Sequence, residues 1–198
     1  ELVVQEIRTA YLLDVQYYVR VNIAMLVELI DAVGGVDITI TPAEAAYINS
    51  EKGKSTAGDI RRRSELQTVS AGTVHMNGVT GMVYARCRDV DSDLGRMGRH
   101  QTVIKAAIEK AKTLNATQLN NLLNTVLPLV KTNLPTGTIT KYMLEAPAFL
   151  SANKEVESIT MPQEGTYGTR IGMEGRSLFD VDFNRNLKDL RKFLYGVE

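Results

Sequence analysis

Residues 15–40, VQYYVRVNIAMLVELIDAVGGVDITI, carry the clearest structural pattern in the chain. Residues 15–21 are rich in β-branched and aromatic side chains, which is typical of a strand, and Asn22 is suited to cap a following helix. That helix has apolar side chains at helical spacing and ends at a glycine pair. Residues 36–40 then alternate apolar and polar side chains, as a half-buried strand does. The chain is therefore predicted to open as a β-α-β unit.

The remaining sequence alternates between strand-like and helical segments. We expect an exposed loop at 52–72 and strands at 82–88, 156–161 and 177–183. Helices are expected at 96–112, at 117–134 with a break at Pro128, at 138–150, and from Asn184 onward. This order favours an α/β fold, layered α/β/α with a mixed central sheet flanked by helices, in a single domain of residues 1–198 truncated at its N-terminal side.

Composition limits the possible functions. The chain has 198 residues with 23 basic and 23 acidic side chains, and this neutral balance argues against a general nucleic-acid binder. Cys87 is the single cysteine, which excludes an intrachain disulfide and a multi-cysteine metal site. No apolar run is long enough to span a bilayer and residues 1–13 lack a signal-peptide layout, so we expect this chain to be soluble. Because it starts without Met, we expect it to be a piece of a longer protein.

The stretch 84–101, YARCRDVDSDLGRMGRHQ, concentrates both signs of charge in this neutral chain. If residues 82–88 form a strand, Arg86 and Arg88 share one face about 7 Å apart, while the opposite face is small and apolar. This spacing suits two phosphates or one pyrophosphate, because guanidinium groups bind phosphate oxygens in pairs.

A helix is predicted to begin near Arg96, immediately after this loop. Arg96, Arg99 and His100 are three and four residues apart, so their side chains point in similar directions. The unpaired backbone N–H groups of a helix start also favour an anion. The stretch therefore predicts an anion-binding site made by two elements.

Two other interpretations of the stretch exist, of which the first stays open and the second fails on its residues. Its charges can neutralise one another as surface salt bridges, which contribute only about 0–1 kcal/mol each. Asp89, Asp91 and Asp93 also alternate like the first ligands of a calcium loop. However, Leu94 stands where that loop needs glycine, and His100 stands where it needs glutamate.

Three segments together resemble the LytR-CpsA-Psr family of bacterial cell-envelope enzymes. Residues 17–40 are similar to the family's strand-helix-strand segment that ends in Asp-x-x-Gly-Gly-Val. Residues 75–88, HMNGVTGMVYARCR, are similar to its Leu-Asn-Gly…Ala-x-x-Tyr-x-Arg-x-Arg segment. Residues 91–101, DSDLGRMGRHQ, are similar to Asp-(Phe/Tyr)-Gly-Arg-x-x-Arg-Gln-Gln. The segments follow the family's order and cover 11–40 and 72–105 well.

The resemblance implies transfer of an anionic glycopolymer, of the teichoic acid or capsular polysaccharide type, from an undecaprenyl-pyrophosphate carrier to peptidoglycan. It implies that Arg86, Arg88 and Arg96 hold the pyrophosphate and lipid head group, together with Arg99. Asp93 would be a catalytic or arginine-orienting group, and Arg96 would act beside it on the transferring phosphoryl group.

The chain also departs from the family pattern. His100 stands where the family has Gln, so His100 or Gln101 is expected to supply that hydrogen bond to the head group. Family members carry upstream a membrane helix, metal-binding aspartates and a further arginine. Mg or Mn is therefore expected for the complete domain, with ligands mainly outside this chain, which supplies no metal ligands of its own. The fragment alone is then expected to be inactive unless that part is supplied.

The implied partners are a polyprenyl-pyrophosphate-linked glycan and peptidoglycan, at the extracytoplasmic face of the bacterial membrane and without nucleic acid. Two alternatives remain open, namely an envelope-associated transcriptional regulator or attenuator and a non-catalytic polyprenyl-phosphate-binding module. The leucine stripe at 119–130 is either core or a groove for a polyprenyl chain.

Overall fold

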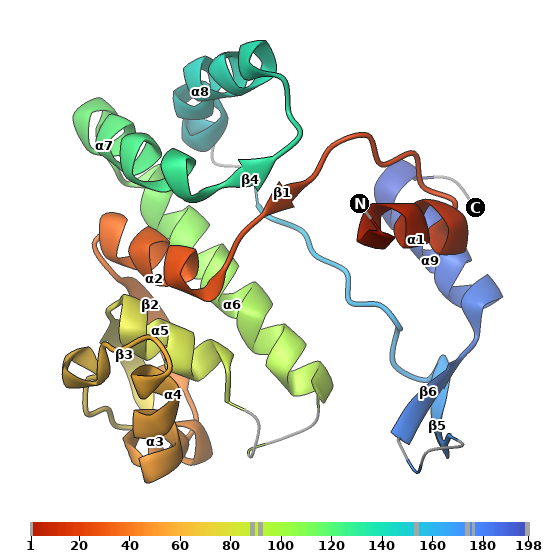
Figure 1. Cartoon of the computed structure of the whole chain (residues 1–198), viewed down its shortest axis with the longest axis horizontal. Helices are drawn as coiled ribbons and strands as arrows, with labels where there is room; N and C mark the ends of the chain where they lie inside the picture. Colours follow the sequence, from red (N-terminus) through yellow and green to blue (C-terminus); the bar gives the residue numbers. More distant parts are fainter. Residues whose placement is uncertain are drawn as a thin grey trace. The chain divides into compact units, whose positions relative to one another are not determined.

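A computed structural model of the chain describes residues 2–87, 90, 93–152, 155–172, 175 and 177–196 (Figure 1). The backbone forms two compact units, one of residues Gln16–Val156 and one that combines Glu1–Val15 with Glu157–Glu198. The arginine-rich stretch belongs to the larger unit.

The predicted strand-helix-strand segment is present in the larger unit as β1 (Val19–Arg20), α2 (Ile23–Ala32) and β2 (Val36–Ile40). Asn22 caps α2 as predicted, because its Oδ1 accepts a hydrogen bond from the Met25 backbone N–H at 2.8 Å. The glycine pair that follows α2 has φ values of 84° and 89°, which side chains disfavour, and the helix ends there.

The first strand is much shorter than predicted, and it does not pair with the strand that follows α2. β1 pairs antiparallel with β4 (Lys131–Thr132). Just before β1, side-chain hydrogen bonds take the place of strand-to-strand hydrogen bonds. The side chain of Asn133 accepts from Tyr18 N–H at 2.8 Å and donates to the Gln16 carbonyl at 3.0 Å. The backbone just before β1 is therefore held by the side chains of Asn133 and Thr132, which local β-propensity does not reveal.

β2 pairs antiparallel with β3 (Gly72–Met76), from Val36 opposite Met76 to Ile40 opposite Gly72. Alternate residues of β2 are buried, which confirms the predicted half-buried strand. The mixed class of helices and strands is confirmed, and the strands of the described residues form three antiparallel pairs, β1–β4, β2–β3 and β5–β6.

The loop predicted at 52–72 is wrong over its first part. The helix α3 (Pro42–Asn49) is followed directly by α4 (Glu51–Gly58) and a 3₁₀ turn, η1 (Arg63–Glu65). Thr41 caps α3 in a reciprocal capping box with Glu44, and Ser50 caps α4. These caps explain why a polar, glycine-containing segment is helical.

The strand predicted at 82–88 is also wrong. Residues Gly78–Ala85 form the helix α5, and all eight of its residues are buried. A helix enclosed on every side needs no polar face, so its sequence lacks the helical period and reads like a short buried strand. In Figure 1, α5 lies between α2 and α4 and beside α6, which are its packing neighbours.

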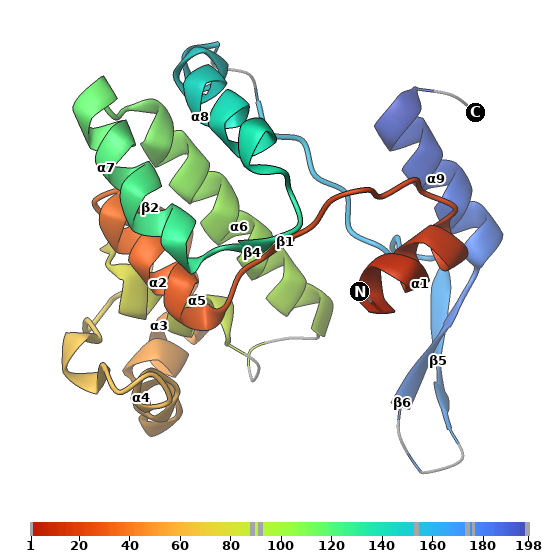
Figure 2. The same ribbon diagram turned by 45° about the horizontal axis from the view of Figure 1, so that its top comes forward.

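The predicted helices that follow are present with small shifts. They are α6 (Asp93–Lys112), α7 (Ala116–Val126) and α8 (Thr136–Ser151). The break expected at Pro128 is confirmed, because a 3₁₀ turn, η2 (Leu127–Leu129), replaces the α-helix there. Figure 2 shows α7 and α8 as separate rods beside α6.

The smaller unit contains α1 (Leu2–Tyr11), the hairpin of β5 (Tyr167–Ile171) and β6 (Ser177–Val181), and α9 (Phe183–Tyr195). The last strand and helix confirm the prediction, and the rings of Tyr11 and Phe183 bring α1 and α9 together at 6.2 Å between centroids. The strand predicted at 156–161 is wrong. Residues 155–160 have no regular secondary structure, and the Thr160 carbonyl accepts from the side chain of Gln163 at 2.6 Å.

The core of the larger unit is built around α5. Its buried side chains pack with those of α2, β2, β3, α3 and α6, including Ile30, Val36, Ile48, Met76, Met82 and Val103. Burying apolar surface stabilises a fold by about 25 cal/mol per Å². The packing around α5 is therefore the main source of stability for the unit.

We expect Gly78→Ala to destabilise the protein by about 1–3 kcal/mol, as overpacking does. A Cβ at Gly78 would lie 2.2 Å from the Val27 carbonyl oxygen and 2.8 Å from Asp31 Oδ2. Urea unfolding followed by circular dichroism measures the change. The matched control is Gly98→Ala in α6, where a Cβ meets nothing within 4 Å among the described residues. There, alanine should be neutral or stabilising by up to about 1 kcal/mol. Equal effects of the two substitutions would contradict the close contact at Gly78.

Candidate functional site

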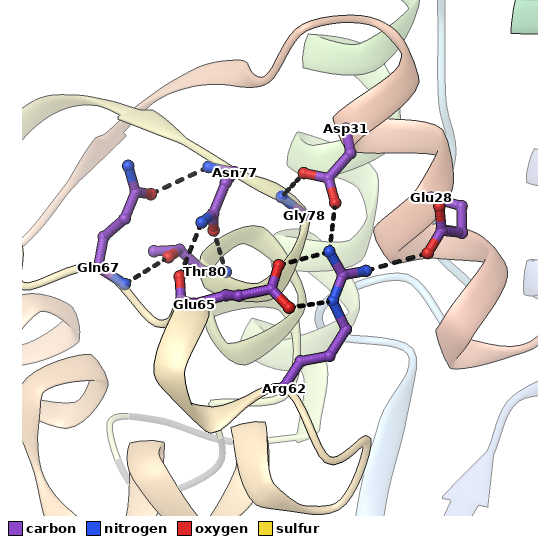
Figure 3. Close-up of polar contacts among 8 residues, drawn as sticks. All are labelled: Glu28, Asp31, Arg62, Glu65, Gln67, Asn77, Gly78 and Thr80. Carbon is purple, nitrogen blue, oxygen red and sulfur yellow. Dashed lines mark hydrogen bonds and ion pairs between the residues drawn. The ribbon is translucent and has the colours of Figure 1, made fainter.

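The N-terminus of α5 is held by a polar cluster around Asp31 (Figure 3). Asp31 Oδ1 accepts from the Gly78 backbone N–H at 2.6 Å, and Oδ2 accepts from Arg62 Nη2 at 3.1 Å. Arg62 also binds Glu28 at 3.0 Å and the Glu65 carboxylate. The Asp31 carboxylate thus satisfies an N–H group that the helix itself leaves unpaired. It also balances part of the positive charge of Arg62.

Asn77 completes the start of α5. Its Oδ1 accepts from Thr80 N–H at 2.9 Å, and its own N–H donates to Gln67 Oε1 at 2.9 Å (Figure 3). The motif residues Asp31, Asn77 and Gly78 therefore position α5 in the fold.

Arg86 lies at the other end of α5. It is the C-cap residue, and its N–H donates to the Met82 carbonyl at 3.1 Å. Its side chain is about one third exposed and reaches Asp59 at the end of α4, with 3.0 Å between Nη1 and Oδ2. Because Asp59 is itself half exposed, this pair is a surface salt bridge that an anionic ligand can replace.

Arg99 lies behind this end of α5 and is only 3% exposed. Its Nη2 donates to the Cys87 carbonyl at 2.6 Å, and its Nη1 lies 3.5 Å from Glu44 Oε1. Arg99 thus contacts the backbone next to Arg86 from the protein side.

His100 follows Arg99 in α6 and is exposed. Partial burial, together with the positive charges of Arg96 and Arg99, lowers the pKa of His100 below its ordinary value of 6.5. A hydrogen bond with the Ala85 backbone acts in the opposite direction. The lowered pKa favours the neutral form of His100, which can form hydrogen bonds without adding charge.

Arg86 and His100 line one apolar pocket of about 370 Å³. The other walls come from α2, the residues just before it, α5 and α6. They are formed by Val21, Asn22, Ile23, Met25, Leu26, Leu29, Met82, Ala85 and Ile104. A cationic and a neutral polar group thus stand on a pocket that is otherwise apolar, which suits a ligand with a charged head and an apolar tail.

A second apolar pocket, of about 430 Å³, lies between α7, η2, β4 and α8. The leucine stripe divides between core and pocket: Leu119 and Leu122 are buried in the core, whereas Leu123 and Leu127 line this pocket.

The structure brings together part of the predicted site. Arg86 and His100 share the pocket, and Arg96 is close enough to His100 to affect its pKa. Gln101 is partly buried in α6. Arg88 lies outside the described residues, and the side chain of Asp93, the first residue of α6, lies outside them as well.

Sequence reasoning missed the carboxylates that pair with these arginines. Asp59 is the C-cap of α4 and Glu44 belongs to α3, and no spacing in the sequence connects them to Arg86 or Arg99. The pocket wall was also missed, because Ile23 and Leu26 at helical spacing indicate only a core face.

Among the described residues, no three His, Cys, Asp or Glu side chains converge as a metal site. These residues by themselves do not fit the Mg or Mn that the resemblance implies. No helix in the described part of the chain is long and apolar enough to cross a membrane.

The model of the LytR_cpsA_psr family matches residues 1–190. The chain belongs to the LytR_cpsA_psr family. Membership confirms the resemblance drawn from the three motifs and includes both units of the structure.

Relatives of this LytR_cpsA_psr chain carry two kinds of name. Biofilm regulatory protein A of Streptococcus mutans is 29% identical over 78% of this chain and 36% of its own length. The polyisoprenyl-teichoic acid–peptidoglycan teichoic acid transferase TagU of Bacillus cereus is 28% identical over 61% of this chain and 34% of its own length. The chain thus spans about a third of the length of these relatives.

The fold matches solved structures of the family. TagT bound to LIIa-WTA has a TM-score of 0.69 and 22% identity, over 98% of this chain and 66% of that one. At this identity, the match establishes the shared fold of the LytR_cpsA_psr chain.

We expect acid to destabilise the wild-type protein more than the variant His100→Gln. Because the folded state binds the His100 proton less tightly than the unfolded chain, the unfolded chain gains protons first as pH falls. The free energy of unfolding therefore falls from about pH 6.5 down through the lower pKa of the folded state. Melting temperatures from pH 8 to pH 5 test this. The wild-type protein should lose more than the variant below about pH 6.5, and parallel curves would contradict the lowered pKa.

Proposed function

We propose that the complete protein transfers an anionic glycopolymer, of the teichoic acid or capsular polysaccharide type, from an undecaprenyl-pyrophosphate carrier to peptidoglycan. This chain supplies the site for the pyrophosphate head group and the first part of the lipid. The observation that carries the proposal is the position of Arg86 and His100 on an apolar pocket. The names of the TagU relative and the ligand of TagT support the same class of substrate.

The charged part of the donor binds at the C-terminal end of α5. Arg86 exchanges its salt bridge with Asp59 for a phosphate oxygen, and Arg96 approaches from the start of α6. Arg88, which lies outside the described residues, joins them on the basis of its motif. His100 or Gln101 donates a hydrogen bond to the same head group.

The apolar part of the donor lies along the pocket beneath these groups. Its walls, which include Ile23, Leu26 and Leu29 of α2, remove isoprenoid surface from water. A free sugar phosphate gains nothing from this wall, so the pocket favours a lipid-linked donor.

In the proposed reaction, a peptidoglycan hydroxyl oxygen attacks the phosphorus that carries the glycopolymer. The bond from this phosphorus to the bridging oxygen breaks, polyprenyl phosphate leaves and the hydroxyl loses its proton, so the product is a phosphodiester. Arg86 and Arg96 stabilise the charge that develops on the transferring and leaving phosphates. Asp93 orients these arginines or accepts the proton.

Mg or Mn would neutralise further phosphate charge in the complete domain. We propose that its ligands lie mainly outside this chain, because the resemblance places the metal-binding aspartates upstream of the three matching motifs. The proposed location is the extracytoplasmic face of the bacterial membrane, where the lipid carrier and peptidoglycan meet.

We expect Arg86→Ala to lower transfer by about 10²–10³-fold, which is the usual cost of removing one preorganised charge-stabilising donor. The measurement is the initial rate of full-length protein with a polyprenyl-pyrophosphate-linked sugar, a peptidoglycan acceptor and Mn²⁺. Asp59→Asn is the matched control, because it removes the same salt bridge but keeps the arginine. The control should retain most activity.

Other outcomes of this assay are informative. Wild-type rates in Arg86→Ala would overturn the site assignment. Binding of the donor without transfer by the wild-type protein would indicate a polyprenyl-phosphate-binding module. A DNA complex that persists near about 0.2 M salt would indicate a regulator.

A further inference from the structure

Arg99 is one of the few buried charged residues among those the structure describes, and its contacts connect three elements. It belongs to α6, its Nη2 donates to the Cys87 carbonyl at 2.6 Å just beyond α5, and its Nη1 faces Glu44 of α3 at 3.5 Å. Only 3% of Arg99 and 8% of Glu44 is exposed. The buried arginine therefore directs its charge inward, toward the protein.

Glu44 is itself held in place. Its Oε2 accepts from the Thr41 N–H at 2.9 Å, and its N–H donates to Thr41 Oγ1 at 3.2 Å, so the capping box of α3 orients the carboxylate. The remaining oxygen, Oε1, is the one that faces Arg99. A rigid helix cap thus fixes the arginine from behind.

The carbonyl that Arg99 binds occupies a sensitive position. Cys87 is the residue between Arg86 and Arg88, and its N–H still donates to Tyr84 at the end of α5, at 3.1 Å. The carbonyl is the first acceptor group beyond the helix cap, and the charge-assisted hydrogen bond from Arg99 restricts its orientation. Because Arg86 directly precedes Cys87, a fixed Cys87 backbone also restricts the position of Arg86.

We propose that Arg99 is a positioning residue. With Glu44 it forms a buried strut that fixes the Cys87 carbonyl and so positions the adjacent Arg86 for the pyrophosphate. This role rests on the proposed function, but the strut itself does not. The resemblance instead implied that Arg99 contacts the head group directly, as one of the ligands of the phosphate.

The single cysteine of the chain reports on the strut independently of activity. Cys87 is fully buried, so a thiol reagent reaches it only when the backbone around it opens. We expect Arg99→Lys to speed labelling of the Cys87 peptide at least tenfold, followed by mass spectrometry of the full-length protein. Lysine keeps the charge but not the two-pronged geometry.

Arg63→Lys is the matched control. Arg63 makes an exposed arginine–carboxylate pair with Glu51 at 3.0 Å in the same unit, and its replacement should leave both labelling and transfer unchanged. Glu44→Gln is the second variant, because glutamine keeps an oxygen for Thr41 but loses the charge that faces Arg99. It decides the question if Arg99→Lys does not fold.

In transfer assays with the polyprenyl-pyrophosphate-linked sugar, Arg99→Lys should lower the rate at least tenfold. In the Arg86→Ala background the same substitution should cost clearly less, because part of its effect passes through Arg86. If Arg99 supports only the overall structure, the fold-losses in transfer rate of the two single variants multiply in the double variant. That result would overturn the proposal.

Two further outcomes separate this proposal from the proposed function. Slower transfer with unchanged labelling of Cys87 would overturn positioning in favour of direct contact. If the wild-type protein transfers nothing, labelling still decides on the strut: faster labelling supports it, and wild-type labelling in both Arg99→Lys and Glu44→Gln overturns it.

Discussion

The carboxylate of Asp31 is the contact on which the larger unit depends. It lies at the end of α2 and accepts a hydrogen bond from the first residue of α5, Gly78, while it also binds Arg62. An N–H group at a buried helix start needs such a partner, because water cannot reach it. Glycine is required at position 78, since the Val27 carbonyl leaves no room for a Cβ. This hydrogen bond joins Asp31 of one motif to Gly78 of another, 47 residues further along the chain.

The rest of the site follows from the position of α5. All its residues are buried, so the surrounding elements α2, α4 and α6 fix its axis, and its C-terminal end delivers Arg86 to the surface. On one side of Arg86 are the apolar residues of α2, and on another is His100 of α6. The site therefore combines a partly exposed charge with a preformed apolar wall. Behind it, Arg99 and Glu44 form a buried pair, which hydrogen bonds to the Cys87 carbonyl and from Thr41 hold in place.

The structure brings Arg86 and His100 onto one pocket, but with a geometry that differs from the predicted one. The spacing of Arg96 and His100 placed them near each other, because three to four residues along a helix always bring side chains together. The spacing of Arg86 and Arg88 was interpreted as one face of a strand, whereas Arg86 caps a helix. Arg99 was grouped with the head-group arginines, and its burial could not be seen because the burial depends on Glu44, which is 55 residues away.

The sequence by itself determined the local features. Asn22 capping α2, the glycine pair after it, the alternation in β2 and the amphipathic α9 are set by backbone and side-chain chemistry within a few residues. Family membership also followed from motifs in their order. Only the tertiary structure decided that Gly78–Ala85 is a helix, that β1 pairs with β4, and which arginine is buried. Each of these depends on partners distant in the chain, and an apolar segment enclosed on all sides carries no period that reveals its conformation.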